Sequence, residues 1–100
     1  MEYKDYVLVK HGEFSKVYLF EAPFCSGLEP GDTVMVEHGK NGEAVGDVVA
    51  VASFEAGGDK EDFIIKATGA YLPLKRIVKK MYFQELEYGE ENKDERADNN

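Results

Sequence analysis

The chain has 100 residues, of which 43% are hydrophobic and 32% are charged, and its formal net charge at pH 7 is −8. These proportions are typical of one small soluble domain with a single modest core. No run of about 18 apolar residues occurs, and the charged start MEYKDYVLVK is unlike a secretory signal, so we expect neither a membrane span nor export. The single cysteine, Cys25, excludes an intrachain disulfide and favours a reducing, cytoplasmic setting.

The negative charge is spread over the whole chain. Residues 90–100 carry five acidic and two basic side chains, and residues 1–89 carry fifteen acidic and ten basic ones. An acidic body repels nucleic acid and anionic membranes at long range. The charge therefore disfavours both of these as the main partner.

Two paired strands are expected at the start of the chain. Residues 3–10 alternate, with Val7 and Val9 on one side and Tyr6, Leu8 and Lys10 on the other. A turn at Gly12 follows, and residues 16–21 alternate in the same way, so the two segments pair as a hairpin. Pro23 has no amide hydrogen to donate, so we expect no central strand in residues 22–27.

A second hairpin, within residues 28–54, organises the rest of the chain. In residues 33–37 the alternation places Val34 and Val36 on one face, and residues 46–54 are rich in β-branched side chains. Gly39, Asn41 and Gly42 lie between the two segments and favour a tight reversal. We expect Val49 to lie in the core of this hairpin.

A short helix is predicted near residues 60–69. Asp59 is a suitable helix cap, and Gly69 stands where a glycine commonly ends a helix. Phe63, Ile64 and Ala67 are spaced three and four apart, which predicts one buried face.

The segment after the helix fits two structures. Leu74, Ile77, Val78 and Met81 match helical spacing, but Pro73 precedes a run of strand-favouring residues, and we favour a strand over residues 75–86. Residues 88–100 lack apolar periodicity, which predicts a disordered acidic tail. The predicted fold of residues 1–87 is therefore mainly β with one short α-helix: a small five-stranded antiparallel SH3-like or OB-like β-barrel.

Two segments carry a resemblance to known proteins. One is Gly31, Asp32, Val34 and Val36 followed by Gly46, Val48, Val49 and Val51, and the other is Thr68, Gly69, Ala70, Pro73, Leu74, Lys75, Arg76, Ile77 and Val78. The first is similar to the N-terminal domain of the primosomal helicase and to KOW-type barrels. Together they resemble small uncharacterised proteins of Firmicutes phages and mobile elements, over most of residues 3–86. The resemblance implies a small β-barrel and a phage or mobile-element origin.

The sequence offers little for catalysis or metal binding. His11, His38 and Cys25 are residue types that occur in metal sites and in nucleophile–base pairs. No two of them have the short spacing of a zinc site. Loop histidines and an unremarkable thiol are the simpler interpretation. We therefore expect no enzyme, no cofactor, no metal and no small-molecule ligand.

One segment suggests binding. Lys75, Arg76, Lys79 and Lys80 lie within six positions and are followed by Tyr82 and Phe83. Basic groups beside an aromatic ring can hold a nucleic-acid backbone and stack a base. On a strand the four alternate between two faces, and lysines also protect an exposed strand edge from aggregation.

Two functions follow from these observations. The first is an interaction module that binds a protein partner or associates with itself through the barrel. The alternative is weak single-stranded nucleic-acid binding by residues 75–83, with Lys75, Arg76, Lys79, Lys80 and Tyr82 as the candidate residues.

Overall fold

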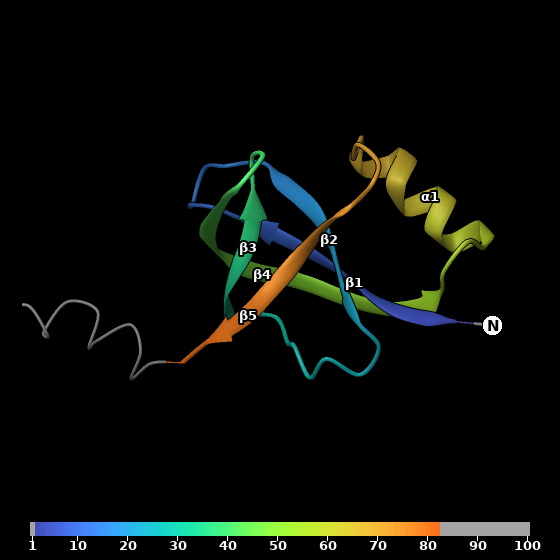
Figure 1. Cartoon of the computed structure of the whole chain (residues 1–100), viewed down its shortest axis with the longest axis horizontal. Helices are drawn as coiled ribbons and strands as arrows, with labels where there is room; N and C mark the ends of the chain where they lie inside the picture. Colours follow the sequence, from blue (N-terminus) through green and yellow to red (C-terminus); the bar gives the residue numbers. More distant parts are fainter. Residues whose placement is uncertain (1, 83–100) are drawn as a thin grey trace, which may run out of the picture.

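The structure, a computed structural model, describes residues 2–82. It contains five strands and one helix: β1 (Tyr3–Lys10), β2 (Val17–Pro23), β3 (Thr33–His38), β4 (Gly42–Glu55), α1 (Asp59–Thr68) and β5 (Lys75–Met81) (Figure 1). The mainly β prediction is confirmed, and β5 decides for a strand in the segment after the helix. The end of that predicted strand, residues 83–86, the rest of the predicted domain to residue 87 and the predicted tail lie outside the described residues.

The five strands form a sheet that closes on itself in the order β1-β2-β5-β3-β4. The expectation of an all-antiparallel sheet is wrong, because β2 and β5 run parallel and the sheet is mixed. Between β4 and β5 the chain passes through α1, which lies on the outside of the sheet. Strand β5 then lies beside β2 and runs in the same direction. The SH3-like or OB-like description of the topology stays a prediction.

The long strand β4 joins the two antiparallel hairpins. Its first half pairs with β3 and its second half with β1, and Asp47 has register partners in both, Thr33 and Lys10. Gly46 stands at this crossing, where a Cβ atom would lie 2.5 Å from Cγ1 of Val9 and 3.0 Å from the carbonyl oxygen of Lys10. Only glycine allows this approach without displacing a buried strand.

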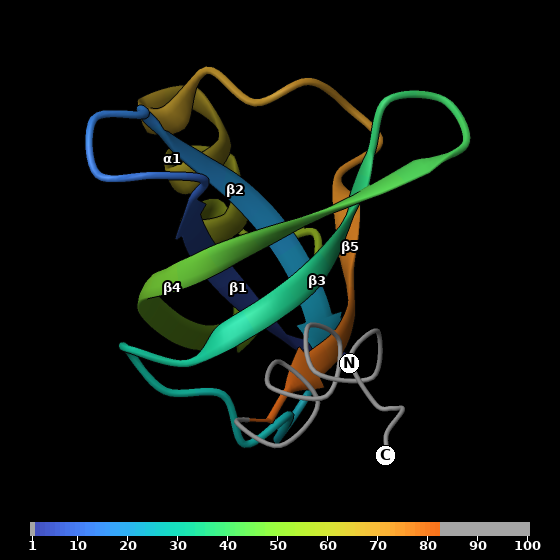
Figure 2. The same cartoon turned by 90° about the vertical axis from the view of Figure 1, so that its left-hand side faces the viewer.

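Two apolar clusters lie on opposite faces of the sheet. As predicted, Val7 and Val9 point into the closed sheet, with Val34 and Val36 from β3. Tyr6 points outward and packs on Phe54, with ring centroids 4.3 Å apart, beneath the helix. Strand β1 is thus buried on both faces, because α1 lies outside the sheet against β2 and β4 (Figure 2).

The predicted helix face is confirmed at Ile64 and wrong at Phe63 and Ala67, which are exposed. Ile64 and Ile65 pack against the outer cluster, whereas Phe63 is 71% exposed. Glu61 is on the packed face too, and its carboxylate accepts hydrogen bonds from the Tyr6 hydroxyl, at 2.7 Å, and the Gly57 amide, at 2.7 Å. Because Glu61 is polar, a prediction from the spacing of apolar residues alone does not include it, and the predicted face is displaced from the observed one.

The ends of two elements also differ from the prediction. The helix begins after Gly58, with Asp59 in its first turn rather than at the cap, and Gly69 in the left-handed conformation follows its last residue as predicted. Strand β2 continues through Ala22 to Pro23, where we expected no central strand. Proline is tolerated there because it is the last residue of the strand.

Val49 does not lie in the core. Val48 pairs with Val9 and Ala50 with Leu8, so Val49 is the extra residue of a β-bulge. The bulge shifts the alternation, and Val48 is 4% exposed whereas Val49 is 40% exposed.

Aspartate substitutions at these neighbouring valines test which of the two side chains points into the core. We expect Val48→Asp to abolish cooperative unfolding, because an unpaired buried charge costs several kcal/mol, a large part of the about 5–15 kcal/mol that stabilises a domain. Val49→Asp should remain folded with a nearly unchanged melting temperature. Thermal unfolding followed by circular dichroism measures both, and the reverse order of the two variants would contradict the register of β4.

Candidate functional site

A groove opens between β2 and β5 where their pairing stops. The parallel ladder has only two register pairs, Phe20 with Lys75 and Glu21 with Arg76, and beyond them the strands run apart (Figure 1). The space between them, about 650 Å³, is the β2–β5 groove. Its apolar walls come from the N-terminal segment and from both strands: Tyr3, Ala22, Pro23, Phe24, Ile77 and Val78.

Several apolar side chains of the β2–β5 groove remain open to solvent. Tyr3 is 45% exposed, Phe24 is 52% exposed and Val78 is 45% exposed. The rings of Tyr3 and Phe24 contact each other, with centroids 5.6 Å apart. Exposed aromatic and aliphatic groups gathered in one concave region are typical of a binding site rather than of a general surface.

A β-bulge interrupts the regular pairing of β5 beside the β2–β5 groove. Strand β3 pairs its Met35 with Lys79 and its Val36 with Ile77, so Val78 is an extra residue between two ladder positions. Within the described ladders Val78 has no register partner on either β2 or β3.

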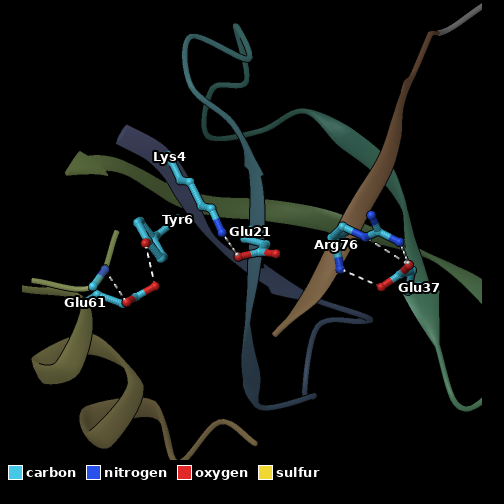
Figure 3. Close-up of polar contacts among 7 residues, drawn as sticks. Lys4, Tyr6, Glu21, Glu37, Glu61 and Arg76 are labelled. Atoms are coloured by element: carbon cyan, nitrogen blue, oxygen red, sulfur yellow. Dashed lines mark hydrogen bonds and ion pairs between the residues drawn. The ribbon is translucent and has the colours of Figure 1, made fainter. Parts of the chain in front are cut away.

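Two ion pairs line the β2–β5 groove (Figure 3). The Lys4 ammonium lies 3.1 Å from the Glu21 carboxylate, and the hydrogen bond between them raises the pKa of Lys4. The guanidinium of Arg76 donates to Glu37 through Nη2 at 3.1 Å and Nε at 3.3 Å, and the Arg76 amide donates to the same carboxylate at 2.9 Å. The amide hydrogen bond, followed by the guanidinium, lowers the pKa of Glu37, so this carboxylate stays ionised at neutral pH.

The loop that carries Phe24 is held by a buried carboxylate. Asp5 is 3% exposed, and it accepts hydrogen bonds from the Ser26 amide at 2.9 Å, the Ser26 hydroxyl at 2.5 Å and the Ser53 hydroxyl at 2.6 Å. Burial alone raises the pKa of Asp5, but the hydrogen bonds from Ser26 and Ser53 outweigh it, and the net shift is downward. Asp5 therefore fixes the loop to β1 and β4 as a charged acceptor.

The predicted basic segment is largely occupied by internal partners. Beyond the Arg76–Glu37 pair, the Lys75 ammonium donates to the Gly39 carbonyl at 3.0 Å, and the Lys80 ammonium lies 3.4 Å from Asp32 and 5.4 Å from the ring centre of Tyr82. Lys79 and Tyr82 are exposed, and Phe83 lies outside the described residues. Strand β3 and the residues directly before and after it thus supply oxygen acceptors for these basic side chains, which the sequence did not indicate.

A second concave region brings basic and aromatic side chains together. It has a volume of about 510 Å³ and lies between the turn after β1, the end of β3 and the segment that follows α1. We call it the basic depression and define it by six of the side chains that line it: His11, Lys16, Tyr18, His38, Tyr71 and Lys75.

The two histidines meet in the basic depression, and Cys25 does not. The imidazole centroids of His11 and His38 are 6.1 Å apart. The β1–β2 register, from Lys4 with Pro23 to Lys10 with Val17, places Cys25 beyond the opposite end of that hairpin. The part of the chain that the structure describes holds no group of three His, Cys, Asp or Glu side chains placed to bind a metal ion.

Sequence reasoning missed the β2–β5 groove and most of the basic depression. Their side chains come from segments far apart in the chain, and no short motif contains them. The available signal was the presence of aromatic residues next to charged ones, at Tyr3 with Lys4 and at Lys16 with Tyr18. Their meaning depends on which strands become neighbours.

Comparison of the chain with protein-family models, with curated proteins and with solved structures gives no match. The resemblance to phage proteins and to bacterial β-barrels therefore stays a prediction. Within residues 2–82, no helix has the length and apolar character needed to cross a membrane.

Replacing Asp5 with asparagine tests the anchor of the Phe24 loop. We expect Asp5→Asn to lower the free energy of unfolding by about 1 to 3 kcal/mol at neutral pH, because charge-assisted hydrogen bonds are lost. The folded pKa is depressed, so this stabilisation is complete above about pH 4 and is lost as the pH falls through the folded pKa. The difference between wild type and variant should therefore shrink below about pH 4.

Chemical denaturation over a series of pH values gives this difference directly. The exposed carboxylate of Glu13 in the turn after β1 provides the control, and Glu13→Gln should leave the free energy of unfolding nearly unchanged. A penalty for Asp5→Asn that is the same at acidic and neutral pH would contradict the ionised anchor.

Proposed function

We propose that the protein is a non-enzymatic interaction module that binds an extended segment of a partner protein in the β2–β5 groove. The observation that carries the proposal is the early end of the β2–β5 ladder beside exposed apolar side chains. An extended peptide that lies between two separated strands can satisfy backbone groups and place alternate side chains in the groove.

The geometry favours an extended segment over a helix. The described β2–β5 ladder ends at Arg76, so the β2-facing backbone of β5 around Val78 is a place where an added strand can bond. The flanking walls, Pro23 with Phe24 on one side and Ile77 with Val78 on the other, are both strand or strand-end backbone. A partner segment with apolar side chains at every second position fits this arrangement.

The ion pairs contribute orientation and selectivity. Glu21 with Lys4, and Glu37 with Arg76, present both signs of charge at the groove. Such pairs discriminate between partners more than they add affinity.

The alternative, nucleic-acid binding by residues 75–83, has less support. Two of its candidate residues, Arg76 and Lys80, are already ion-paired with carboxylates within the protein. A phosphate would have to compete with these contacts.

Selection of peptides from a random displayed library, followed by titration of a selected peptide into isotope-labelled protein, tests the peptide proposal. We expect amide shifts concentrated at Ala22, Phe24 and Val78. Val78→Lys should weaken binding by about tenfold or more, because it places a charge in the apolar wall. Measurement of the dissociation constants by fluorescence anisotropy gives the size of this effect.

Val49→Lys is the matched control, since Val49 is another exposed bulge valine that lies outside the groove lining. It should bind the peptide as wild type does. Selected peptides that shift other surfaces, or that bind both variants equally, would contradict the proposal. Concentration-dependent dimerisation that Val78→Lys abolishes would instead identify a second copy of the chain as the occupant.

A further inference from the structure

The basic depression carries cations without carboxylates in an otherwise acidic protein. Lys16 and Lys75 line it together with His11 and His38, and none of the described residues that line it is Asp or Glu. The chain as a whole has 20 acidic and 12 basic side chains. A local excess of positive charge against this background marks a place where an anion is attracted and not repelled.

The lysines keep donors available for such an anion. The Lys75 ammonium gives one hydrogen bond to the Gly39 carbonyl at 3.0 Å, and an ammonium has three donors in all. The Lys16 ammonium lies over the ring of Tyr18, 5.1 Å from its centroid, so its contact within the protein is with an aromatic face.

Aromatic rings stand beside these cations. Tyr18 is 43% exposed and Tyr71 is 91% exposed, and both line the basic depression. Exposed aromatic faces next to lysines are what a nucleobase attached to a phosphate requires, because the base stacks while the phosphate meets the ammonium groups. The volume of about 510 Å³ is within the range of pockets that hold small organic groups.

His11 is held in one orientation in the basic depression. Its Nδ1 lies 3.0 Å from the Val45 carbonyl oxygen, which can only accept, so Nδ1 donates a hydrogen bond to it. The ring also contacts those of Tyr18, at 5.8 Å between centroids, and His38, at 6.1 Å. The imidazole is therefore held in place by one hydrogen bond and two ring contacts.

We propose that the basic depression binds a nucleotide unit of a single-stranded nucleic acid, with phosphate at Lys16 and Lys75 and a base stacked on Tyr71. This site is separate from the β2–β5 groove and does not depend on the peptide proposal. It also differs from residues 75–83, because Lys75 is the one residue among the described part of that segment, 75–82, that lines the depression.

Fluorescence anisotropy of a short labelled oligothymidylate with the purified chain, at low and moderate salt, tests the proposal. We expect salt-sensitive binding that the double variant Lys16→Ala and Lys75→Ala weakens by about tenfold or more. The two lysines share one phosphate, and its loss should reduce the slope of log affinity against log salt by about 0.7, the value per phosphate for single strands.

A second double variant, Lys79→Ala and Lys80→Ala, removes the same charge from the far part of β5 and is the matched control. It should retain the wild-type affinity. Tyr71→Ala, at a position 91% exposed and therefore expected to fold, should weaken binding by about tenfold with an unchanged salt slope, because stacking releases no counterions.

Four results would overturn the proposal. They are flat titrations at low salt, equal losses of affinity in the two double variants, loss of affinity in the Lys79 and Lys80 variant alone, and unchanged affinity in Tyr71→Ala.

Thymidine monophosphate is the competitor that distinguishes binding of a strand from binding of a free nucleotide. Competition equal to that of the unlabelled strand would assign the pocket to a free nucleotide instead. Val78→Lys should bind the strand normally, so failure here is distinguishable from failure of the peptide proposal.

Discussion

The close approach of β4 to β1 at Gly46 is the constraint on which the rest of the structure depends. A side chain there would meet Val9, whose position inside the closed sheet is fixed by its neighbours. Because Gly46 has none, one long strand can pair with β3 and then with β1, and Asp47 can have register partners in both. Two local hairpins thereby become one sheet with a common core.

The opening between β2 and β5 is a consequence of this arrangement. The antiparallel ladders of β1, β3 and β4 are long, and the sheet closes through the remaining parallel contact, which has two register pairs. Parallel pairing is slightly weaker per residue than antiparallel pairing, and β5 is bent by a bulge at Val78. The sheet is thus weakest where the groove lies, and within residues 2–82 no further strand covers the apolar side chains that are exposed there.

The sequence predicted local structure better than long-range structure. Alternation identified the strands and the inward faces at Val7 and Val34, because these depend only on a period of two. It failed at Val49, where a bulge changes the phase, and at Phe63, where Glu61 takes part in the packed face. The basic segment was visible, but its partners Glu37 and Asp32 were not, because strand neighbours are set by topology. The groove and the depression have no motif, so only the fold reveals them.

Residue-resolved amide hydrogen exchange of the free protein, followed by NMR, determines whether the β2–β5 ladder ends early and leaves the backbone at Val78 open, as the proposed peptide binding requires. We expect rapid exchange at Val78 and slow exchange at Val7 and Val34, which are buried within continuous ladders. Protection at Val78 equal to that at Val7 would show that the sheet is sealed at this position, and the groove would not exist in solution.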